Sequence, residues 1–136
     1  MYKNIMNYVC EMVEDFEAIE IVENSEYLAY NINDGKLYVP ETVEEDEEFD
    51  NFMISYLKEW FDLELTKEEL KIFYVLHEIG HHETRQYVDY DAYMDEVETI
   101  DNRDYLRYRL ISAERLADHW AACFIDAFGL DEKLFN

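Results

Sequence analysis

The segment TKEELKIFYVLHEIGHH, residues 66–82, constrains the fold more than any other part of the chain. Thr66, followed three residues later by Glu69, has the form of a capping box, which marks the start of a helix. The apolar residues that follow recur at helical spacing, at Leu70, Phe73, Leu76 and Ile79, with Gly80 beside the last. We therefore expect a largely buried helix, which requires further elements packed around it.

Two histidines and a glutamate interrupt this apolar helix. His77 and His81 are four residues apart, so their imidazoles project from one face and can bind the same ion. Two buried neutral imidazoles need partners, and a metal ion satisfies both. Glu78 points about 100° around the helix, off the metal but within reach of a metal-bound water, as a general base must be. This is the H-E-x-x-H arrangement of zinc peptidases.

A helical pattern over residues 104–129 offers a third ligand. Glu114, Ala117, Asp118 and Ala121 share one face of the expected helix. The alanines would let it approach the metal helix closely, with Glu114 as third zinc ligand and water in the fourth position. Asp118 could accept the free N–H of a zinc-bound histidine. Taken alone, these carboxylates would more often be solvated, but together with H-E-x-x-H they favour a metal site, and two imidazoles with a carboxylate suit Zn²⁺ best.

The two motifs together resemble a known family. HEIGH at 77–81 is followed, 33 residues after His81, by ERLADHWA at 114–121. The pair resembles the short gluzincin core of the ImmA/IrrE family of metallopeptidases, whose pattern is H-E-x-G-H and then E-x-x-A-(N/D)-x-(F/W)-A. The resemblance covers roughly residues 66–128.

This resemblance implies a minimal zincin-like fold with a definite set of site residues. By position, His77, His81 and Glu114 would bind zinc, Glu78 would be the base, and Asp118 would support a ligand. Members of the family are commonly encoded by phages and mobile elements. They are implicated in cleaving or inactivating helix-turn-helix repressors, so the resemblance implies a repressor-like protein substrate.

The rest of the chain predicts an α+β fold with a helical core and a small antiparallel sheet. Apolar spacing predicts helices over residues 2–17 and 51–63. Between them, alternating residues predict two or three antiparallel strands, with a hairpin over 26–40 that turns at Asp34-Gly35. The acidic stretch 43–51 is expected to be a solvated loop that leads into the second helix. No repeat or linker interrupts the sequence, so residues 1–136 are expected to form a single domain.

The charge balance limits the classes of partner. The chain has 34 acidic and 11 basic residues, for a formal net charge of -23. Such a surface repels nucleic acid and anionic membranes and favours a basic protein partner. Charged residues interrupt the first twenty positions, and no apolar run reaches the ~18 residues of a membrane span, so we expect a cytoplasmic protein. Cys10 and Cys123 each fall in a helical apolar pattern and are expected to be reduced, packed thiols.

Five residues near the motifs have no assigned role. His82 and His119 fit packing or partly exposed positions better than a fourth ligand, because a hydrolytic site keeps one position open. Tyr87, Tyr90 and Tyr93 lie between the two site helices, where one of them could donate to an oxyanion or simply pack.

The sequence therefore supports two hypotheses about function. The first is a zinc metallopeptidase that hydrolyses a peptide bond in a basic protein substrate, with the hairpin supplying an edge strand for that substrate. The alternative is a non-catalytic acidic binding module, an inhibitor or antirepressor that retains the fold and imitates DNA by its charge.

Overall fold

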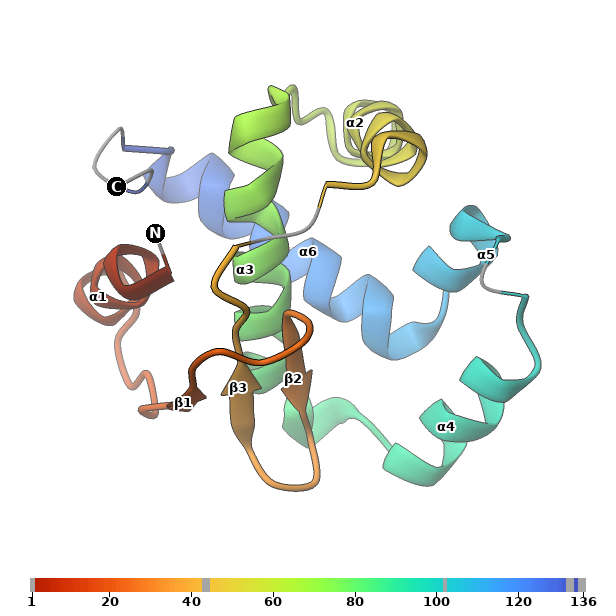
Figure 1. Cartoon of the computed structure of the whole chain (residues 1–136), viewed down its shortest axis with the longest axis horizontal. Helices are drawn as coiled ribbons and strands as arrows, with labels where there is room; N and C mark the ends of the chain where they lie inside the picture. The colour runs from red at the N-terminus through yellow and green to blue at the C-terminus, as the bar shows by residue number, and fades with distance from the viewer. Residues whose placement is uncertain (1, 43–44, 102, 132–133, 135–136) are drawn as a thin grey trace.

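The computed structural model describes residues 2–42, 45–101, 103–131 and 134, and it shows a mixed α+β fold (Figure 1). In chain order the elements are α1 (Tyr2–Met12), β1 (Glu20–Val22), β2 (Ala29–Asn31), β3 (Lys36–Tyr38), α2 (Glu47–Phe61), α3 (Lys67–Glu83), the 3-10 turn η1 (Arg85–Tyr87), α4 (Tyr90–Glu98), α5 (Tyr105–Arg109) and α6 (Ser112–Phe128). The expected α+β class is confirmed.

Helix α3 is the centre of the fold, and the predicted capping box starts it. The Thr66 hydroxyl accepts from the backbone N–H of Glu69, and the Glu69 carboxylate accepts from the backbone N–H of Thr66. The apolar side chains of α3 are almost completely buried, among them Leu70, Ile72, Phe73, Val75, Leu76 and Ile79. Helix α6 crosses α3 and packs against it, and α1, α2 and strand β2 also contact α3 (Figure 1).

The sheet has the strand order β1-β3-β2 and is mixed rather than antiparallel. Strands β2 and β3 form the predicted antiparallel hairpin, with Tyr30 opposite Leu37. Strand β1 pairs with the other side of β3 in parallel, so the antiparallel prediction was wrong for this strand. The whole of β2 lies between β1 and β3 in sequence, and this intervening segment brings the chain back to pair in the same direction. Strand β2 is therefore an edge strand.

Several helix boundaries in the structure differ from the predicted ones, and each difference has a local cause. Helix α1 ends at Met12 rather than residue 17, and Asp15 beyond it has a left-handed backbone with φ of 59°. Helix α2 starts earlier than predicted, inside the acidic stretch, where Asp46 caps it by accepting from the N–H of Phe49. The hairpin loop uses one left-handed residue, Gly35, with φ of 68°. Residues 43 and 44 of the acidic stretch lie outside the described residues.

The last helical pattern is interrupted by a corner. The chain forms the short helix α5, turns at Leu110 and Ile111, and then forms α6, which ends at Gly129 as expected. A continuous helix from residue 104 was therefore wrong, because Ile111 has an extended backbone with ψ of 134°. This corner turns Arg109 into the interior, where its side chain is 7% exposed.

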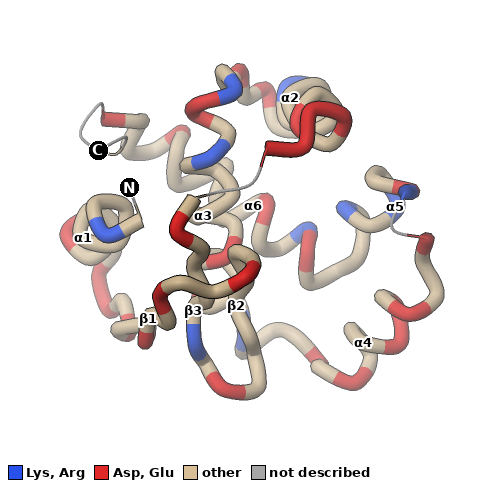
Figure 2. The backbone as a smooth tube through the Cα atoms, in the orientation of Figure 1, with Lys and Arg blue, Asp and Glu red and all other residues tan. Residues whose placement is uncertain are grey.

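Acidic residues outnumber basic ones and are spread over helices, strands and loops of the described chain (Figure 2). Cys10 and Cys123 are free thiols, but both are exposed, so the expectation that they pack in the core was wrong. On α1 the buried side is formed by Ile5, Met6 and Val9, which leaves Cys10 on the solvent side. Among the described residues, no helix is long and apolar enough to cross a membrane.

Candidate metal centre

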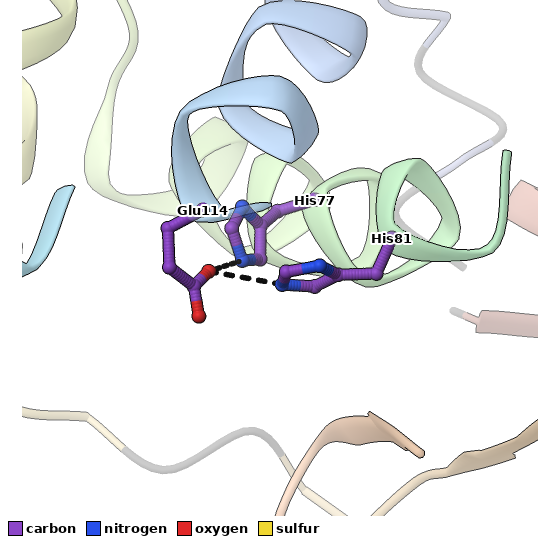
Figure 3. Close-up of side chains that lie close together, drawn as sticks. All are labelled: His77, His81 and Glu114. Atoms are coloured by element: carbon purple, nitrogen blue, oxygen red, sulfur yellow. Dashed lines mark hydrogen bonds and ion pairs between the residues drawn. The ribbon is translucent and has the colours of Figure 1, made fainter. Parts of the chain in front are cut away.

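Three buried side chains from α3 and α6 converge on one point (Figure 3). The Nε2 atoms of His77 and His81 each lie 2.9 Å from Oε2 of Glu114. One ligand atom from each residue lies within 4.8 Å of the other two. The structure therefore brings together the three residues that the sequence analysis selected as ligands, and this buried group can hold a metal ion.

A close contact between the two helices makes this convergence possible. A Cβ atom placed on Gly80 would lie 2.8 Å from the backbone oxygen of Ala117, which is too close for any side chain. Gly80 lies between the two histidines on α3, and Ala117 lies between Glu114 and Asp118 on α6. The absence of a side chain at Gly80 thus lets the carboxylate helix reach the imidazoles.

Asp118 orients the first histidine. Its Oδ1 accepts a hydrogen bond from Nδ1 of His77 at 2.7 Å, and the Tyr56 hydroxyl donates to its Oδ2 at 3.3 Å. The Asp118 side chain has no exposed surface. Donation from Nδ1 places the free electron pair of neutral His77 on Nε2, the atom that faces Glu114 and His81.

Side chains outside the ligand set also contact Glu114, and Tyr93 was the one sequence candidate among them. Tyr93, on α4, donates its hydroxyl to Oε1 of Glu114 at 2.8 Å. Arg109 was not predicted; its Nη2 lies 3.3 Å from Oε2 of Glu114 and its Nη1 lies 3.6 Å from Oδ1 of Asp118. Its position five residues before Glu114 carried no sequence signal, because the corner at 110–111 creates the contact.

Glu78 faces the centre without joining it. Its Oε1 lies 3.9 Å from Nε2 of His77, and its Oε2 accepts a hydrogen bond of 2.8 Å from the backbone N–H of Tyr30. Tyr30 is on the edge strand β2, so the strand fixes one oxygen of Glu78 and leaves Oε1 directed at the centre. Burial raises the pKa of the Glu78 carboxyl, which favours its ability to hold a proton.

The electrostatics of the centre favour a cation. Burial opposes the charged form of His77, but the carboxylates of Asp118 and Glu114 outweigh burial and raise the pKa of His77 to about 10. Burial likewise opposes ionisation of Glu114, yet hydrogen bonds from His77 and His81 hold its pKa well below the usual range. The carboxylates thus stabilise positive charge between the rings. A divalent cation meets the same demand with both Nε2 atoms as ligands, so these residues fit a metal ion.

Two neighbouring hollows include residues of the centre in their walls. One, of about 290 Å³, is lined by His77, Glu78 and Glu114. The other, of about 410 Å³, is lined by His81, Tyr93 and the strand β2. Both include Glu26 and Tyr27, which precede β2, in their walls, so the two hollows adjoin there, and the larger one continues along β2 itself.

The remaining sequence candidates lie away from the cluster or serve the fold. His82 is buried, with Nδ1 2.9 Å from the Tyr30 hydroxyl and Nε2 3.1 Å from the backbone oxygen of Glu17. His119 is exposed and lies beside Cys123, and Tyr87 is 74% exposed. Tyr90 lines the larger of these two hollows. Among the described contacts it has no ion pair or hydrogen bond with the three candidate ligands.

Comparison with protein-family models, with curated proteins and with solved structures finds no match.

Proposed function

We propose that the protein is a zinc-dependent metallopeptidase that hydrolyses a peptide bond in a protein substrate. The observation that carries the proposal is the convergence of His77, His81 and Glu114, with Glu78 beside them and outside the ligand set. Two imidazoles and one carboxylate suit zinc and leave a position open, as in hydrolytic rather than structural sites. The resemblance to the ImmA/IrrE family supports the same reading.

Each residue of the centre has a separate role in the proposed hydrolysis. Zinc, when bound by the three ligands, supplies Lewis acidity to the substrate carbonyl and to the attacking water. Glu78 accepts the proton from that water at Oε1, since its Oε2 is engaged by the Tyr30 N–H, and passes the proton to the leaving amine nitrogen. Asp118 keeps His77 in the tautomer that presents Nε2. Water and peptide thereby become a carboxylic acid and an amine.

The edge strand β2 offers a place for an extended substrate. Within the described residues it pairs with β3 alone, and the hollow of about 410 Å³ that it lines also reaches His81. A peptide segment added along this edge would pass over the candidate ligands.

The charge of the protein points to the class of substrate. A chain with a net charge of -23 attracts basic partners and repels nucleic acid. A basic, repressor-like DNA-binding regulator, of phage or mobile-element origin, fits both the charge and the family resemblance. Such a substrate requires the protein to act in the cytoplasm.

The same charge favours a second candidate, a non-catalytic acidic module that occupies a DNA-binding protein without cutting it. The variant Glu78→Gln distinguishes the peptidase from the binding module. The peptidase should retain zinc in this variant and lose cleavage of a basic helix-turn-helix protein. The binding module should bind that protein equally well before and after the substitution, with no cleavage in either case. Cleavage that survives Glu78→Gln would remove Glu78 from the mechanism.

A further inference from the structure

Arg109 is the one basic side chain that contacts the candidate metal centre among the described residues. It is the last residue of α5, and its side chain is 7% exposed. Arginine is seldom buried to this degree unless it is paired. The corner at residues 110–111 brings it back against the first two turns of α6.

The guanidinium spans two carboxylates with different tasks. Its Nη2 lies 3.3 Å from Oε2 of Glu114, the oxygen that faces both imidazoles. Its Nη1 lies 3.6 Å from Oδ1 of Asp118, the oxygen that accepts from His77. Nε of Arg109 has no hydrogen-bond partner within the described part of the chain. The two terminal nitrogens therefore make its contacts with the centre.

His77 also contacts both carboxylates, but it is itself a candidate ligand, whereas Arg109 contacts both from outside the ligand set. Glu114 and Asp118 are four residues apart on α6, so their like charges lie one turn apart and repel each other. The N-cap residue Ile111 gives no side-chain hydrogen bond to the start of this helix. A planar fork of donors can hold two carboxylates at once, whereas an ammonium group acts as a single point charge.

We propose that Arg109 is a positioning residue of the metal centre, which fixes the ligand oxygen of Glu114 and the histidine-orienting oxygen of Asp118 relative to each other. The inference rests on the metal site of the proposed function and is independent of peptide hydrolysis. Two effects of Arg109 oppose each other. Its charge weakens the binding of a cation, and its geometry strengthens it by holding the ligand oxygen in place. We expect the positioning of the ligand oxygen to have a larger effect on zinc affinity than the charge of Arg109.

The test is zinc affinity, measured by competition with a chromophoric chelator, for Arg109→Met and Arg109→Lys. We expect a loss of about 10- to 100-fold for Arg109→Met and a smaller but clear loss for Arg109→Lys, which keeps the charge without the fork. Arg107→Met is the matched control, because Arg107 is an exposed residue of the same helix. It removes the same charge and should leave the affinity unchanged.

The visible spectrum of the cobalt(II)-substituted protein gives a second readout that a purely structural role would not move. We expect the Arg109→Lys spectrum to differ from that of the wild type, with an unchanged far-ultraviolet circular dichroism spectrum. If Arg109→Met does not fold, Arg109→Lys alone decides. Tighter zinc binding in Arg109→Met, or affinity and cobalt spectrum both unchanged in Arg109→Lys, would overturn the proposal. Wild-type protein that takes up no zinc would overturn it together with the site, whereas zinc binding without peptide cleavage would leave it standing.

Discussion

The backbone N–H of Tyr30 donates to Oε2 of Glu78 at 2.8 Å, which joins the edge strand β2 to the candidate general base on α3. The two residues are 48 positions apart in sequence. The N–H of Tyr30 points away from β3, on the side where an edge strand has no partner strand. The strand along which a substrate would lie thus also sets the orientation of the residue that would move the proton.

Removal of this N–H should weaken the proposed activity without loss of zinc. Tyr30→Pro removes the donor at an outward edge position that proline tolerates, and Tyr30→Ala is its control, since it removes the same side chain and keeps the N–H. A hydrogen bond to a charged group contributes about 1.5–3 kcal/mol, so kcat/KM should be lower in Tyr30→Pro than in Tyr30→Ala by about 10- to 100-fold.

The pH dependence of activity in Tyr30→Pro and Tyr30→Ala tests the same hydrogen bond independently. Because the Tyr30 N–H lowers the pKa of the Glu78 carboxyl against the larger effect of burial, its loss should raise that pKa. The acid limb of the activity profile should then move to higher pH in Tyr30→Pro. Identical acid limbs in the two variants would show that the hydrogen bond does not act on Glu78 during turnover.

Gly80→Ala should separate the two site helices. In an ordinary helix interior this change stabilises by up to about 1 kcal/mol, but here the new Cβ would lie 2.8 Å from the backbone oxygen of Ala117. We expect a net loss of about 1–3 kcal/mol in the free energy of unfolding, measured with urea, and weaker zinc binding. Gly129→Ala is the control: it has backbone strain at φ of 75° but open space around it, so it should lose stability without change in zinc affinity.

Loss of any one ligand should abolish stable metal binding. Protein purified without a polyhistidine tag should contain near one zinc per chain by elemental mass spectrometry, and His77→Ala, His81→Ala and Glu114→Ala should contain almost none. His119→Ala removes an exposed histidine of α6 and should keep the metal. Zinc at 100 times its dissociation constant should stabilise the wild type by about 2.7 kcal/mol. Equal zinc content in wild type and ligand variants would place the metal elsewhere.

The candidate ligands and Asp118 could be predicted from the sequence, and the contacts that other segments make with them could not. The face shared by His77 and His81 follows from helix geometry alone, and the small Ala117 indicated which face of the last helix could approach it. Contacts of Arg109 and Tyr30 with the centre depend on a corner between helices and on the register of a strand. Neither leaves a periodic signal in the sequence.

The errors in the predicted fold have the same origin. The parallel pairing of β1 with β3 is a tertiary contact between strands that are separated in sequence by β2. The cysteines were assigned to the core by spacing, but a helix buries only the face that meets a neighbour, and Cys10 lies on the other face of α1. Spacing identified the helices better than it identified their partners.

Zinc binding should release a proton from His77. Because Asp118 and Glu114 outweigh burial and raise the pKa of this imidazole to about 10, protein stripped of metal with a chelator should hold a proton on His77 at pH 7. Zinc must displace that proton to reach Nε2. Calorimetry in two buffers of different ionisation enthalpy should therefore show release of about one proton per zinc, and the apparent affinity should rise about tenfold per pH unit between pH 6 and 8.

The stability of the stripped protein should show the same linkage. A raised histidine pKa stabilises the folded state fully below the unfolded value of 6.5 and loses this contribution as pH rises through about 10. The free energy of unfolding should thus fall across this window for stripped wild type, and less for Asp118→Asn, which lacks one carboxylate partner. Asp118→Asn should also release less than one proton per zinc at pH 8. Proton release near zero in the wild type would mean that His77 is already neutral, and that the centre is held ready for a cation by its geometry alone.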